Sequence, residues 1–520
     1  MDMLVRPSLH YRDVPYHYWL WHAAESYPEQ VALDFEGKAL TFREMEAYAN
    51  GFANCLRNAG VQDGDRVVVM MGNRPESIFA VQGSSIGGAA FVLFSPAWKR
   101  DEAGHAWSLA NAKAVIADAA GAAVLDEIVG PDVIRFCVDP DMPGTGWRYI
   151  GDALDSGQRP ASGSVELDWT DREAGLLFSS GTTGMPKAVV HTHASLNAGL
   201  THWRSVLGMR DSDRIQLTVP LNHILGALTA ACGFASGARL RLFRRFNADL
   251  MLNSIARDKI TIAFVVAPIA KIMADLDNLE EYDLSSLRYM SWSATPASRE
   301  IALKVTERTG VRWLLAYGCS ESPVLHCNPV NDPARWRLDS AGIRVNDMKI
   351  RILKLDGSGD AEPGEAGEIV TKGPSVMRGY LPIEANNDAF TADGWYRTGD
   401  IGWEEEGGWI HVTDRLKEMV KVSGFQVAPA EVEAVLLDNE VVADCAVFGV
   451  PDADKGEVVV AAVKLHDGAS VAPEALINEV ADRISSYKVP GAIHFIDEIP
   501  RTASGKVLRR VLREQFAHTA

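Results

Sequence analysis

The chain has few cysteines for its length. Six occur in 520 residues, and none of them forms a C-x-x-C pair. A disulfide-stapled fold, a structural zinc site and a dithiol redox motif are therefore not indicated. Scattered cysteines in a large acidic chain are typical of the reducing cytoplasm, where most such residues pack as small apolar side chains.

Basic residues are also in deficit. Lys and Arg number 51 against 69 Asp and Glu, which gives a formal net charge of −18 and a pI of about 5.2. Nucleic acids and anionic membranes are polyanions, so this charge argues against sequence-independent binding to either of them. It leaves room for a small anionic ligand that is held by a few local cations.

Long apolar runs and targeting features are missing as well. The most apolar stretches, Ile86–Phe94 and Leu225–Ala235, are well short of the roughly 20 residues that cross a bilayer. The N-terminal sequence has no basic region followed by an apolar core and a small-residue cleavage site, so no secretory signal is predicted. We therefore expect a cytoplasmic protein without an integral membrane segment.

What is present is the composition of a globular protein, with 47% hydrophobic and 23% charged residues. At roughly 100–200 residues per domain, a chain of 520 residues contains several domains. Short apolar segments alternate with helical patterns, which predicts an α/β fold with parallel sheet and crossover helices. The expected elements are strands at Arg66–Met71, Ala89–Phe94, Lys113–Asp118 and Thr261–Pro268 and a helix near 76–87.

The pattern changes near residue 350. Two strand-like segments that are interrupted by Gly and Asp, Lys349–Gly357 and Gly364–Gly373, indicate hairpins. After residue 417 the mixed pattern indicates a small C-terminal α+β module of roughly one hundred residues. Its expected helices and strands are Pro429–Leu437, Cys445–Val450, Glu457–Leu465 and Pro473–Ile484.

The most informative segment reads LLFSSGTTGMPK, from Leu176 to Lys187. An apolar strand leads into small polar residues and glycines, whose N–H groups and hydroxyls can surround phosphate oxygens, and Lys187 adds a compact cation. It is not a Walker A loop, since Met and Pro separate the last Gly from the Lys. A plain hairpin turn is the alternative. We interpret the segment as a phosphate loop with contacts from Ser179, Ser180, Gly181, Thr182, Thr183, Gly184 and Lys187.

Four further motifs follow in sequence. They read YGCSES at Tyr317–Ser322, GWYRTGDI at Gly394–Ile401, DRLKEMVKVSGFQV at Asp414–Val427 and PRTASGKV at Pro500–Val507. Each alone is compatible with a turn or a solvated segment. All five together, in this order and over essentially the whole chain, resemble the motifs of the adenylate-forming superfamily, which contains acyl-CoA synthetases, peptide-synthetase adenylation domains and beetle luciferases.

The resemblance implies a fold and a division of the chain. The expected fold is a large N-terminal domain of stacked mixed or parallel sheets with helices and a β-barrel-like subdomain, followed by a small mobile α+β domain. The domains are expected at 1–416 and 417–520, with the hinge at about 414–417. Lys417 is then the hinge residue, since a hinge is a short segment that absorbs large backbone rotations. The resemblance also allows a homodimer.

The resemblance further implies how ATP and Mg²⁺ are held. Tyr317 would stack on adenine, Ser320 stands where the family usually has Thr near the α-phosphate, and Glu321 would be the ligand of Mg²⁺. Thr182, Thr183 and Lys187 would hold the β- and γ-phosphates. Asp400 would accept the ribose hydroxyls, with Arg415 on the same ribose or on the phosphate.

Further residues take their expected roles from the same resemblance. Lys506 would bridge the carboxylate and the α-phosphate during adenylation, and the segment around Gly424 would line the pantetheine tunnel of CoA. The residues expected to be catalytic are Lys506, Thr183, Glu321 and His223. Other expected contacts with the nucleotide or with CoA are Ala294, Ala316, Gly318, Cys319 and Lys421.

The substrate side departs from the usual family pattern. His223 matches a family position near the carboxylate, but Ser291–Pro296 reads SWSATP where Gly-Gly-Ala-Pro is usual, so Trp292 would shorten or redirect the acyl channel. The expected lining is largely apolar, without a second cation or an Asp for an amino group, which favours a fatty, aromatic or alicyclic monocarboxylic acid. This lining is His223, Ile224, Ala227, Trp292, Ser293, Ala294, Cys319, Pro323 and Val324.

The sequence thus predicts an ATP-dependent acyl-CoA synthetase that uses Mg²⁺ and CoA and passes through an acyl-AMP intermediate, with no nucleic-acid partner. An acyl-AMP ligase that loads a carrier protein remains an alternative, as do a luciferase-like oxygenase and a non-catalytic nucleotide-binding homologue. Retention of Lys187, Glu321, Asp400, Arg415 and Lys506 together argues against the non-catalytic alternative.

Overall fold

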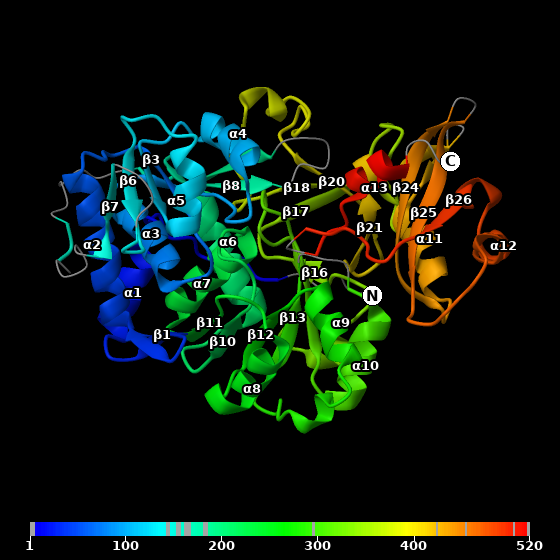
Figure 1. The fold of residues 1–520 in the computed structure, drawn as a ribbon, viewed down its shortest axis with the longest axis horizontal. Helices are drawn as coiled ribbons and strands as arrows, with labels where there is room; N and C mark the ends of the chain where they lie inside the picture. The colour runs from blue at the N-terminus through cyan, green and yellow to red at the C-terminus, as the bar shows by residue number, and fades with distance from the viewer. Residues whose placement is uncertain are drawn as a thin grey trace. The chain divides into compact units, whose positions relative to one another are not determined.

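The computed structural model describes the chain except for residues 1–5, 142–145, 152–157, 161–167, 180–185, 294–296, 423–424, 453–454, 503–504 and 517–520. For residues 414, 415, 417, 425, 426 and 456 it describes the backbone alone. The chain folds into two compact units (Figure 1). The large unit contains residues 6–349 and 371–396, and the small unit contains residues 350–370 and 397–516.

One sheet of the large unit is parallel in its centre and antiparallel at its two edges. Helices α8 (Ala248–Asp258), α9 (Ala267–Asp275) and α10 (Arg299–Thr309) supply side chains to the hydrophobic cluster on one of its faces. Its strands, in spatial order, are β16 (Ile343–Arg344), β15 (His326–Cys327), β14 (Trp313–Tyr317), β13 (Tyr289–Trp292), β12 (Ile262–Val265), β10 (Arg214–Leu217), β11 (Arg239–Leu242), β1 (Val31–Phe35) and β2 (Lys38–Thr41).

The second sheet of the large unit carries the phosphate-loop segment near its antiparallel edge. Helices α4 (Arg100–Ala110) and α5 (Ala119–Asp126) cover one of its faces. Its strands, in spatial order, are β19 (Gly379–Leu381), β9 (Lys187–Thr192), β8 (Glu173–Ser179), β4 (Ala90–Leu93), β3 (Arg66–Met70), β5 (Ala114–Ala117), β6 (Ile134–Cys137) and β7 (Trp147–Tyr149).

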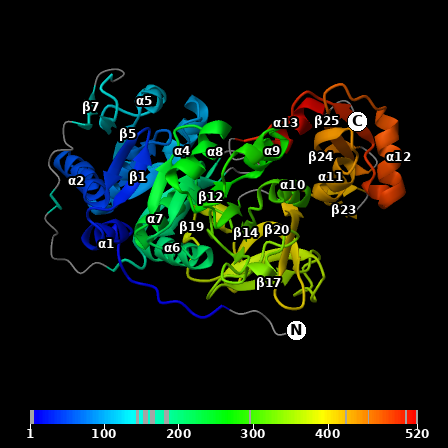
Figure 2. The same cartoon turned by 90° about the horizontal axis from the view of Figure 1, so that it is seen from below.

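A layer of helices connects the two sheets of the large unit (Figure 2). Its members are α1 (Tyr18–Ser26), α2 (Phe42–Asn58), α3 (Pro75–Ile86), α6 (His193–Leu207) and α7 (Ile224–Ser236). Two of the helices begin where the sequence supplies a cap. The Thr41 hydroxyl accepts the Glu44 N–H at the start of α2, and the Thr192 hydroxyl accepts the Ser195 N–H at the start of α6. Short 3₁₀ turns occur at η2 (Leu279–Glu281), η3 (Pro333–Arg335) and η4 (Ile383–Asn386).

The small unit contains two sheets. The first has the order β17 (Lys349–Leu353), β18 (Gly367–Lys372), β20 (Tyr396–Glu404) and β21 (Ile410–Arg415), and the strands β17, β18 and β20 each include one or two residues assigned to the large unit. The second has the order β23 (Phe425–Val427), β22 (Val420–Val422), β25 (Gly456–Leu465) and β24 (Val442–Asp452), with β26 (Ala492–Phe495) paired to β25. The remaining elements are α11 (Pro429–Leu437), α12 (Pro473–Arg483), α13 (Arg509–Phe516), η5 (Leu416–Glu418) and η6 (Ser486–Lys488).

The predicted α/β class, with a large N-terminal part of several sheets and helices and a small C-terminal part, is confirmed. The predicted helix Pro429–Leu437 has the same bounds in the structure, because Pro fits the first helical turn. The barrel-like subdomain and the domain boundary at 416/417 stay predictions. Among the described residues, no helix combines the length and the apolar character needed to cross a membrane.

Several histidines of the large unit are buried in its interior. Burial lowers the pKa of His17, His193 and His326 to about 3 and that of His202 to about 4. These side chains are therefore neutral in the folded protein at neutral pH, whereas an unfolded chain protonates histidine near pH 6.5.

This difference makes the stability of the large unit sensitive to mild acid. Below about pH 6.5 the unfolded state binds more protons than the folded state, so the free energy of unfolding should fall as the pH falls toward 4. Each such histidine contributes a slope of about 1.4 kcal/mol per pH unit. Urea unfolding at pH 7.5, 6.0 and 5.0 measures this, and equal stability at the three pH values would contradict the prediction.

Candidate active site

The phosphate-loop segment connects two antiparallel strands of the second sheet. β8 ends at Ser179 and β9 begins at Lys187, and these two residues lie opposite each other in the strand pairing. The predicted contacts Ser180, Gly181, Thr182, Thr183 and Gly184 lie outside the described residues. The pairing nevertheless fixes both ends of the loop, because β8 is buried along most of its length.

Lys187 and Glu321 meet at one tyrosine. The Nζ atom of Lys187 lies 5.1 Å from the centre of the Tyr380 ring, within reach of a cation–π interaction. The Tyr380 hydroxyl donates to Oε1 of Glu321 over 2.6 Å. The structure thus brings together the predicted phosphate-binding cation and the predicted metal ligand, through a residue that the sequence motifs do not include.

A second tyrosine hydroxyl completes this contact. Oη of Tyr396 lies 3.1 Å from Oη of Tyr380. Because the only proton of the Tyr380 hydroxyl goes to a carboxylate, Tyr396 is the donor to Tyr380. Burial, reinforced by the charge of Glu321, raises the pKa of both tyrosines, so both hydroxyls stay protonated and the donation runs toward the carboxylate.

The motif YGCSES forms a tight loop at the end of β14. The Cys319 N–H donates to the Ser322 carbonyl over 3.0 Å, and the Leu325 N–H donates to the Tyr317 carbonyl over 2.8 Å. A Cβ on Gly318 would lie 2.3 Å from the Pro323 carbonyl oxygen, so only glycine fits at this position. The predicted nucleotide contacts Ala316 and Tyr317 end β14, and Gly318, Cys319 and Ser320 follow them in this loop.

His191 supports this loop from the neighbouring sheet. Its Nε2 atom lies 2.8 Å from the Ser320 carbonyl and its Nδ1 atom lies 3.0 Å from the Ser195 hydroxyl. A carbonyl can only accept, so Nε2 carries the proton. Burial lowers the pKa of His191, which keeps the ring neutral. The sequence motifs do not include His191, so its role was not predicted. The only feature of the sequence that marks it is a single histidine within an otherwise apolar strand.

His223 directly precedes helix α7. Its carbonyl accepts the Ala227 N–H over 3.0 Å, and it is half-buried together with Ile224 and Ala227. The first turn of α7 lies close to the preceding loop, since a Cβ on Gly226 would come within 2.2 Å of the Pro220 carbonyl oxygen. The three predicted pocket residues of this segment therefore share one helix start.

Trp292 lies in the hydrophobic core. It is 1% exposed and its ring centroid lies 5.2 Å from that of Trp313. Core packing accounts for a Trp at this position, and its predicted contact with the acyl chain stays a prediction. Ser293 next to it is 6% exposed, and its hydroxyl has no hydrogen-bond partner among the described residues. Ala294 lies outside the described residues.

Cys319, Pro323 and Val324 follow the adenine motif. Cys319 is half-buried against the cluster of Val189 and Tyr396, and Val324 is fully buried. Pro323 packs against helix α6, where a Cβ on Gly199 would lie 3.1 Å from its ring. These three residues are apolar and closely packed, and their contact with the acyl chain stays a prediction.

In the small unit, Asp400 and Arg415 lie opposite each other in the pairing of β20 with β21. Asp400 is 4% exposed, and its N–H donates to the Thr398 hydroxyl over 3.0 Å. A register shift between Ile401 and Gly402 marks an irregularity beside this pair. The strand pairing thus sets the backbone of Asp400, predicted to bind the ribose, opposite that of Arg415, predicted to bind the same ribose or the phosphate.

Lys506 lies on a short closed loop. Arg501 pairs with Val507 across it, and the Thr502 N–H donates to the Lys506 carbonyl over 2.8 Å. The Arg501 guanidinium donates to both carboxylate oxygens of Asp444, at 2.8 and 3.0 Å, which ties the loop to β24. Lys506 itself is exposed.

The predicted hinge precedes a network of ion pairs. Lys417 belongs to η5, and the next residue, Glu418, forms an ion pair with Arg509 of α13. Arg509 also pairs with Glu433 at 2.6 Å. Lys421 is exposed, with its N–H bonded to Glu457 over 2.7 Å, and Gly424 lies outside the described residues. The chain after Lys417 is therefore anchored to the C-terminal elements.

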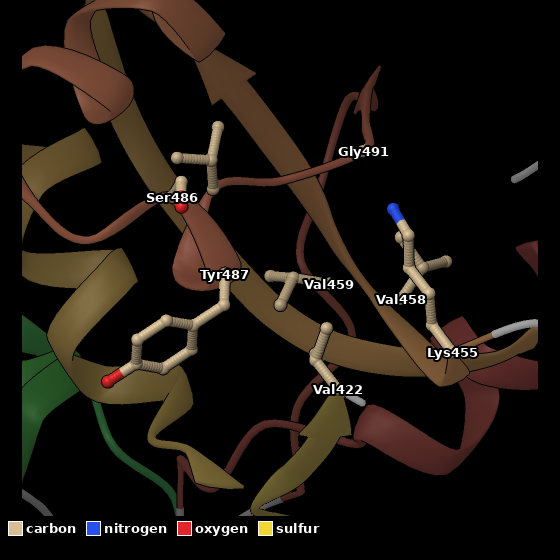
Figure 3. A pocket seen from close by; sticks show the side chains of 8 residues that line it. Val422, Lys455, Val458, Val459, Ser486, Tyr487 and Gly491 are labelled. Carbon is tan, nitrogen blue, oxygen red and sulfur yellow. The ribbon is translucent and has the colours of Figure 1, made fainter. Parts of the chain in front are cut away.

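The small unit also has a cavity of about 220 Å³. Figure 3 shows Tyr487 and Lys455 on opposite sides of it, with Val459 and Val422 between them. The predicted site residues do not belong to its lining, which consists of Val422, Lys455, Val458, Val459, Ser486, Tyr487, Val489 and Gly491.

Gly318 offers a direct test of the loop geometry. Gly318→Ala would place a methyl group against the Pro323 carbonyl, and overpacking of this kind costs about 1–3 kcal/mol. We expect urea unfolding to show a loss of stability in that range. The matched control is Gly104→Ala in α4, where a Cβ meets nothing within 4 Å and alanine favours the helix. Equal stability of the two variants would refute the close approach.

Comparison with known proteins identifies the family. Residues 20–381 match the AMP-binding enzyme family, and residues 431–506 match the AMP-binding enzyme C-terminal domain. The chain is 32% identical over 495 residues to 4-coumarate–CoA ligase 5 of Oryza sativa subsp. japonica, covering 92% of this chain and 90% of that protein. It is also 32% identical over 485 residues to the long-chain-fatty-acid–CoA ligase FadD13 of Mycobacterium tuberculosis, covering 92% and 94% of the two chains.

Solved structures agree with this assignment. The anthranilate CoA ligase AuaEII, in complex with anthranoyl-AMP, superposes with a TM-score of 0.86 at 25% identity, covering 96% of this chain and 97% of that chain. The predicted resemblance to the adenylate-forming superfamily is thus confirmed. The chain belongs to the AMP-binding enzyme family of that superfamily, and its enzyme class is that of the AMP-forming acid–thiol ligases.

Proposed function

We propose that the protein is an ATP-dependent acyl-CoA synthetase that acts on an apolar monocarboxylic acid through an acyl-AMP intermediate. The observation that carries the proposal is the meeting of Lys187 and Glu321 on Tyr380. A fixed cation next to a buried carboxylate is what a metal-bound polyphosphate requires. The curated relatives support the reaction class, since two of them are named as CoA ligases for 4-coumarate and for long-chain fatty acids.

The residues of the large unit fit ATP and a metal ion. Glu321 is 7% exposed, and its Oε1 atom accepts from Tyr380, while Oε2 has no partner among the described side chains. No cluster of three or more His, Cys, Asp or Glu side chains occurs within the described residues. One carboxylate suits Mg²⁺, which usually keeps waters and substrate phosphates as its other ligands. When bound, Mg²⁺ would supply charge neutralisation to the phosphates.

Each unit contains residues that would contact the nucleotide. Tyr317 offers an aromatic face to adenine, and Lys187 offers a cation to the β- and γ-phosphates. In the small unit, Asp400 would accept the ribose hydroxyls, with Arg415 opposite it in the strand pairing. Thr182 and Thr183 would add hydroxyls to the phosphates.

The acyl pocket is proposed between the start of α7 and the loop after β14. Ile224, Ala227 and Pro323 give it an apolar character, and His223 would lie near the carboxylate. The Ser293 hydroxyl has no partner among the described residues, and it offers one polar contact in an otherwise apolar lining. Fatty, aromatic and alicyclic acids all fit this chemistry.

The proposed reaction has two steps. A carboxylate oxygen of the acid attacks the α-phosphorus of ATP, the bond to pyrophosphate breaks, and acyl-AMP forms. Lys506 would neutralise the charge that develops between the carboxylate and the α-phosphate, so catalysis consists mainly of positioning and charge stabilisation. The sulfur of CoA then attacks the acyl carbonyl, and AMP leaves with the electrons of the broken acyl–oxygen bond.

The small domain would change its role between these steps. Rotation about Lys417 would withdraw Lys506 and bring the segment around Gly424 to the acyl-AMP. The network of Glu418, Arg509 and Glu433 supports a rigid-body motion, because it anchors the chain directly after the hinge. We also propose that CoA is the acyl acceptor, that the enzyme acts in the cytoplasm and that it forms a homodimer.

A screen of acids tests the function. Pyrophosphate release should be measured with straight-chain, aryl and alicyclic acids, with and without CoA, and the thioester identified by mass spectrometry. We expect turnover with at least one apolar monocarboxylic acid and formation of its CoA thioester. Transfer of the acyl group to a carrier-protein pantetheine in place of CoA would contradict CoA as the acceptor. Turnover restricted to amino acids or dicarboxylates would contradict the proposed substrate class.

Substitution of Lys506 tests the two half-reactions, adenylation and thioester formation, separately. We expect Lys506→Ala to lower pyrophosphate release by roughly 100-fold or more, since one charge-stabilising group of a transition state is worth about that much. Thioester formation from supplied acyl-AMP should stay within a few-fold of the wild type. The control is Lys304→Ala on the exposed face of α10. Equal losses in both half-reactions would contradict the role of Lys506 in adenylation.

A further inference from the structure

Tyr380 stands between two residues of the proposed nucleotide site and belongs to none of the predicted motifs. Its hydroxyl bonds Glu321 over 2.6 Å, and its ring lies 5.1 Å from the Lys187 ammonium. One side chain therefore contacts both the proposed metal ligand and the proposed phosphate-binding cation. We propose that Tyr380 is a positioning residue of the magnesium–nucleotide site, with the hydroxyl orienting Glu321 and the ring orienting Lys187. This inference rests on the proposed function.

The Tyr380 hydroxyl orients the Glu321 carboxylate because it binds one carboxylate oxygen and leaves the other available to a metal ion. Tyr396 donates to Tyr380, and Tyr380 donates to Oε1 of Glu321. Oε2 of Glu321 has no hydrogen bond or ion pair with the described residues. A hydrogen bond of this kind behind a metal-binding carboxylate fixes its orientation, and the loss of such a bond typically costs 10–100-fold in metal affinity.

The position of Tyr380 is itself fixed from two sides. In the pairing of β19 with β9, Tyr380 lies opposite Val189, two residues after Lys187. The Asn386 side chain accepts the Tyr380 N–H over 2.7 Å and donates to the Tyr380 carbonyl over 3.0 Å. Because the backbone of Tyr380 is held in this way, removing the hydroxyl alone should leave the ring in place.

The two contacts can therefore be separated by substitution. Tyr380→Phe removes the hydroxyl and keeps the ring over Lys187, whereas Tyr380→Leu removes both. Tyr396→Phe removes the donor to Tyr380 and keeps the bond from Tyr380 to Glu321. Tyr282→Phe is the matched control, because the Tyr282 hydroxyl bonds the Asp249 carboxylate over 2.7 Å on the exposed surface.

The measurement is ATP binding by isothermal titration calorimetry, without any acid, in excess Mg²⁺ and in EDTA. We expect Tyr380→Phe to weaken binding about tenfold in Mg²⁺ and less than twofold in EDTA. Tyr380→Leu should weaken binding in both conditions, because it also removes the cation–π contact with Lys187. Tyr396→Phe should weaken the Mg²⁺-dependent binding by only a few-fold, and Tyr282→Phe should change neither value.

A double-mutant cycle with Glu321→Gln isolates the contact. If Tyr380 acts through Glu321, Tyr380→Phe should have less than a twofold effect on Mg²⁺-dependent binding in the Glu321→Gln background. A purely structural role would lower binding equally in Mg²⁺ and in EDTA, and this result overturns the proposal even where the variant is less stable. An unchanged affinity of Tyr380→Phe in Mg²⁺ overturns it as well.

The wild-type enzyme separates this inference from the proposed function. Wild-type ATP binding that is strengthened by Mg²⁺, together with no pyrophosphate release for any acid, would refute the proposed function and leave the role of Tyr380 to be decided by the variants. Wild-type ATP binding that is equal in Mg²⁺ and EDTA would overturn the role of Tyr380, even if an acid supports turnover.

Discussion

The antiparallel pairing of β9 with β8 on one side and with β19 on the other is the constraint on which the candidate site depends. The first pairing sets Ser179 opposite Lys187 and so fixes the two ends of the phosphate loop. The second sets Tyr380 opposite Val189 and so brings a residue from far along the chain next to β9, the strand that begins at Lys187. Strand pairing leaves little freedom in register, because a slip of one residue would turn Tyr380 to the other face.

The chemistry of the site follows from the low exposure of its charged groups. Glu321 is 7% exposed, and a buried carboxylate is costly unless its oxygens find donors. Tyr380 supplies one donor, and the proposed metal ion would interact with the remaining oxygen. Lys187 contributes charge close by, on the face of the same ring. In this way a chain with a net charge of −18 can hold a polyphosphate, because local cations and N–H groups decide small-ligand binding.

The sequence predicted those features that depend on short segments. Strands such as β3 and β12 were predicted because short apolar runs that are rich in β-branched residues and bounded by polar residues or turns favour a buried strand. The tight turn at Gly318 likewise follows from local composition. Tyr380 and His191 were not predicted, because their roles come from contacts with residues more than fifty positions away. No local pattern distinguishes such a tyrosine from an ordinary strand residue.

Trp292 shows that a local sequence pattern also leaves the surroundings of a predicted site residue undetermined. Its departure from the family pattern suggested a place in the acyl pocket, yet strand alternation puts it on the same side as Met290, in the core. Its neighbours Ser291 and Ser293 both have buried hydroxyls that lack a hydrogen-bond partner among the described residues, and Ser293 is the one that belongs to the expected lining. A buried hydroxyl without a partner costs free energy in the empty enzyme, so an acid with a suitably placed polar group would recover that cost on binding. The contacts of Trp292 and Ser293 with the acyl chain therefore stay predictions, and of the two residues Ser293 is the one that offers the acid a hydroxyl as well.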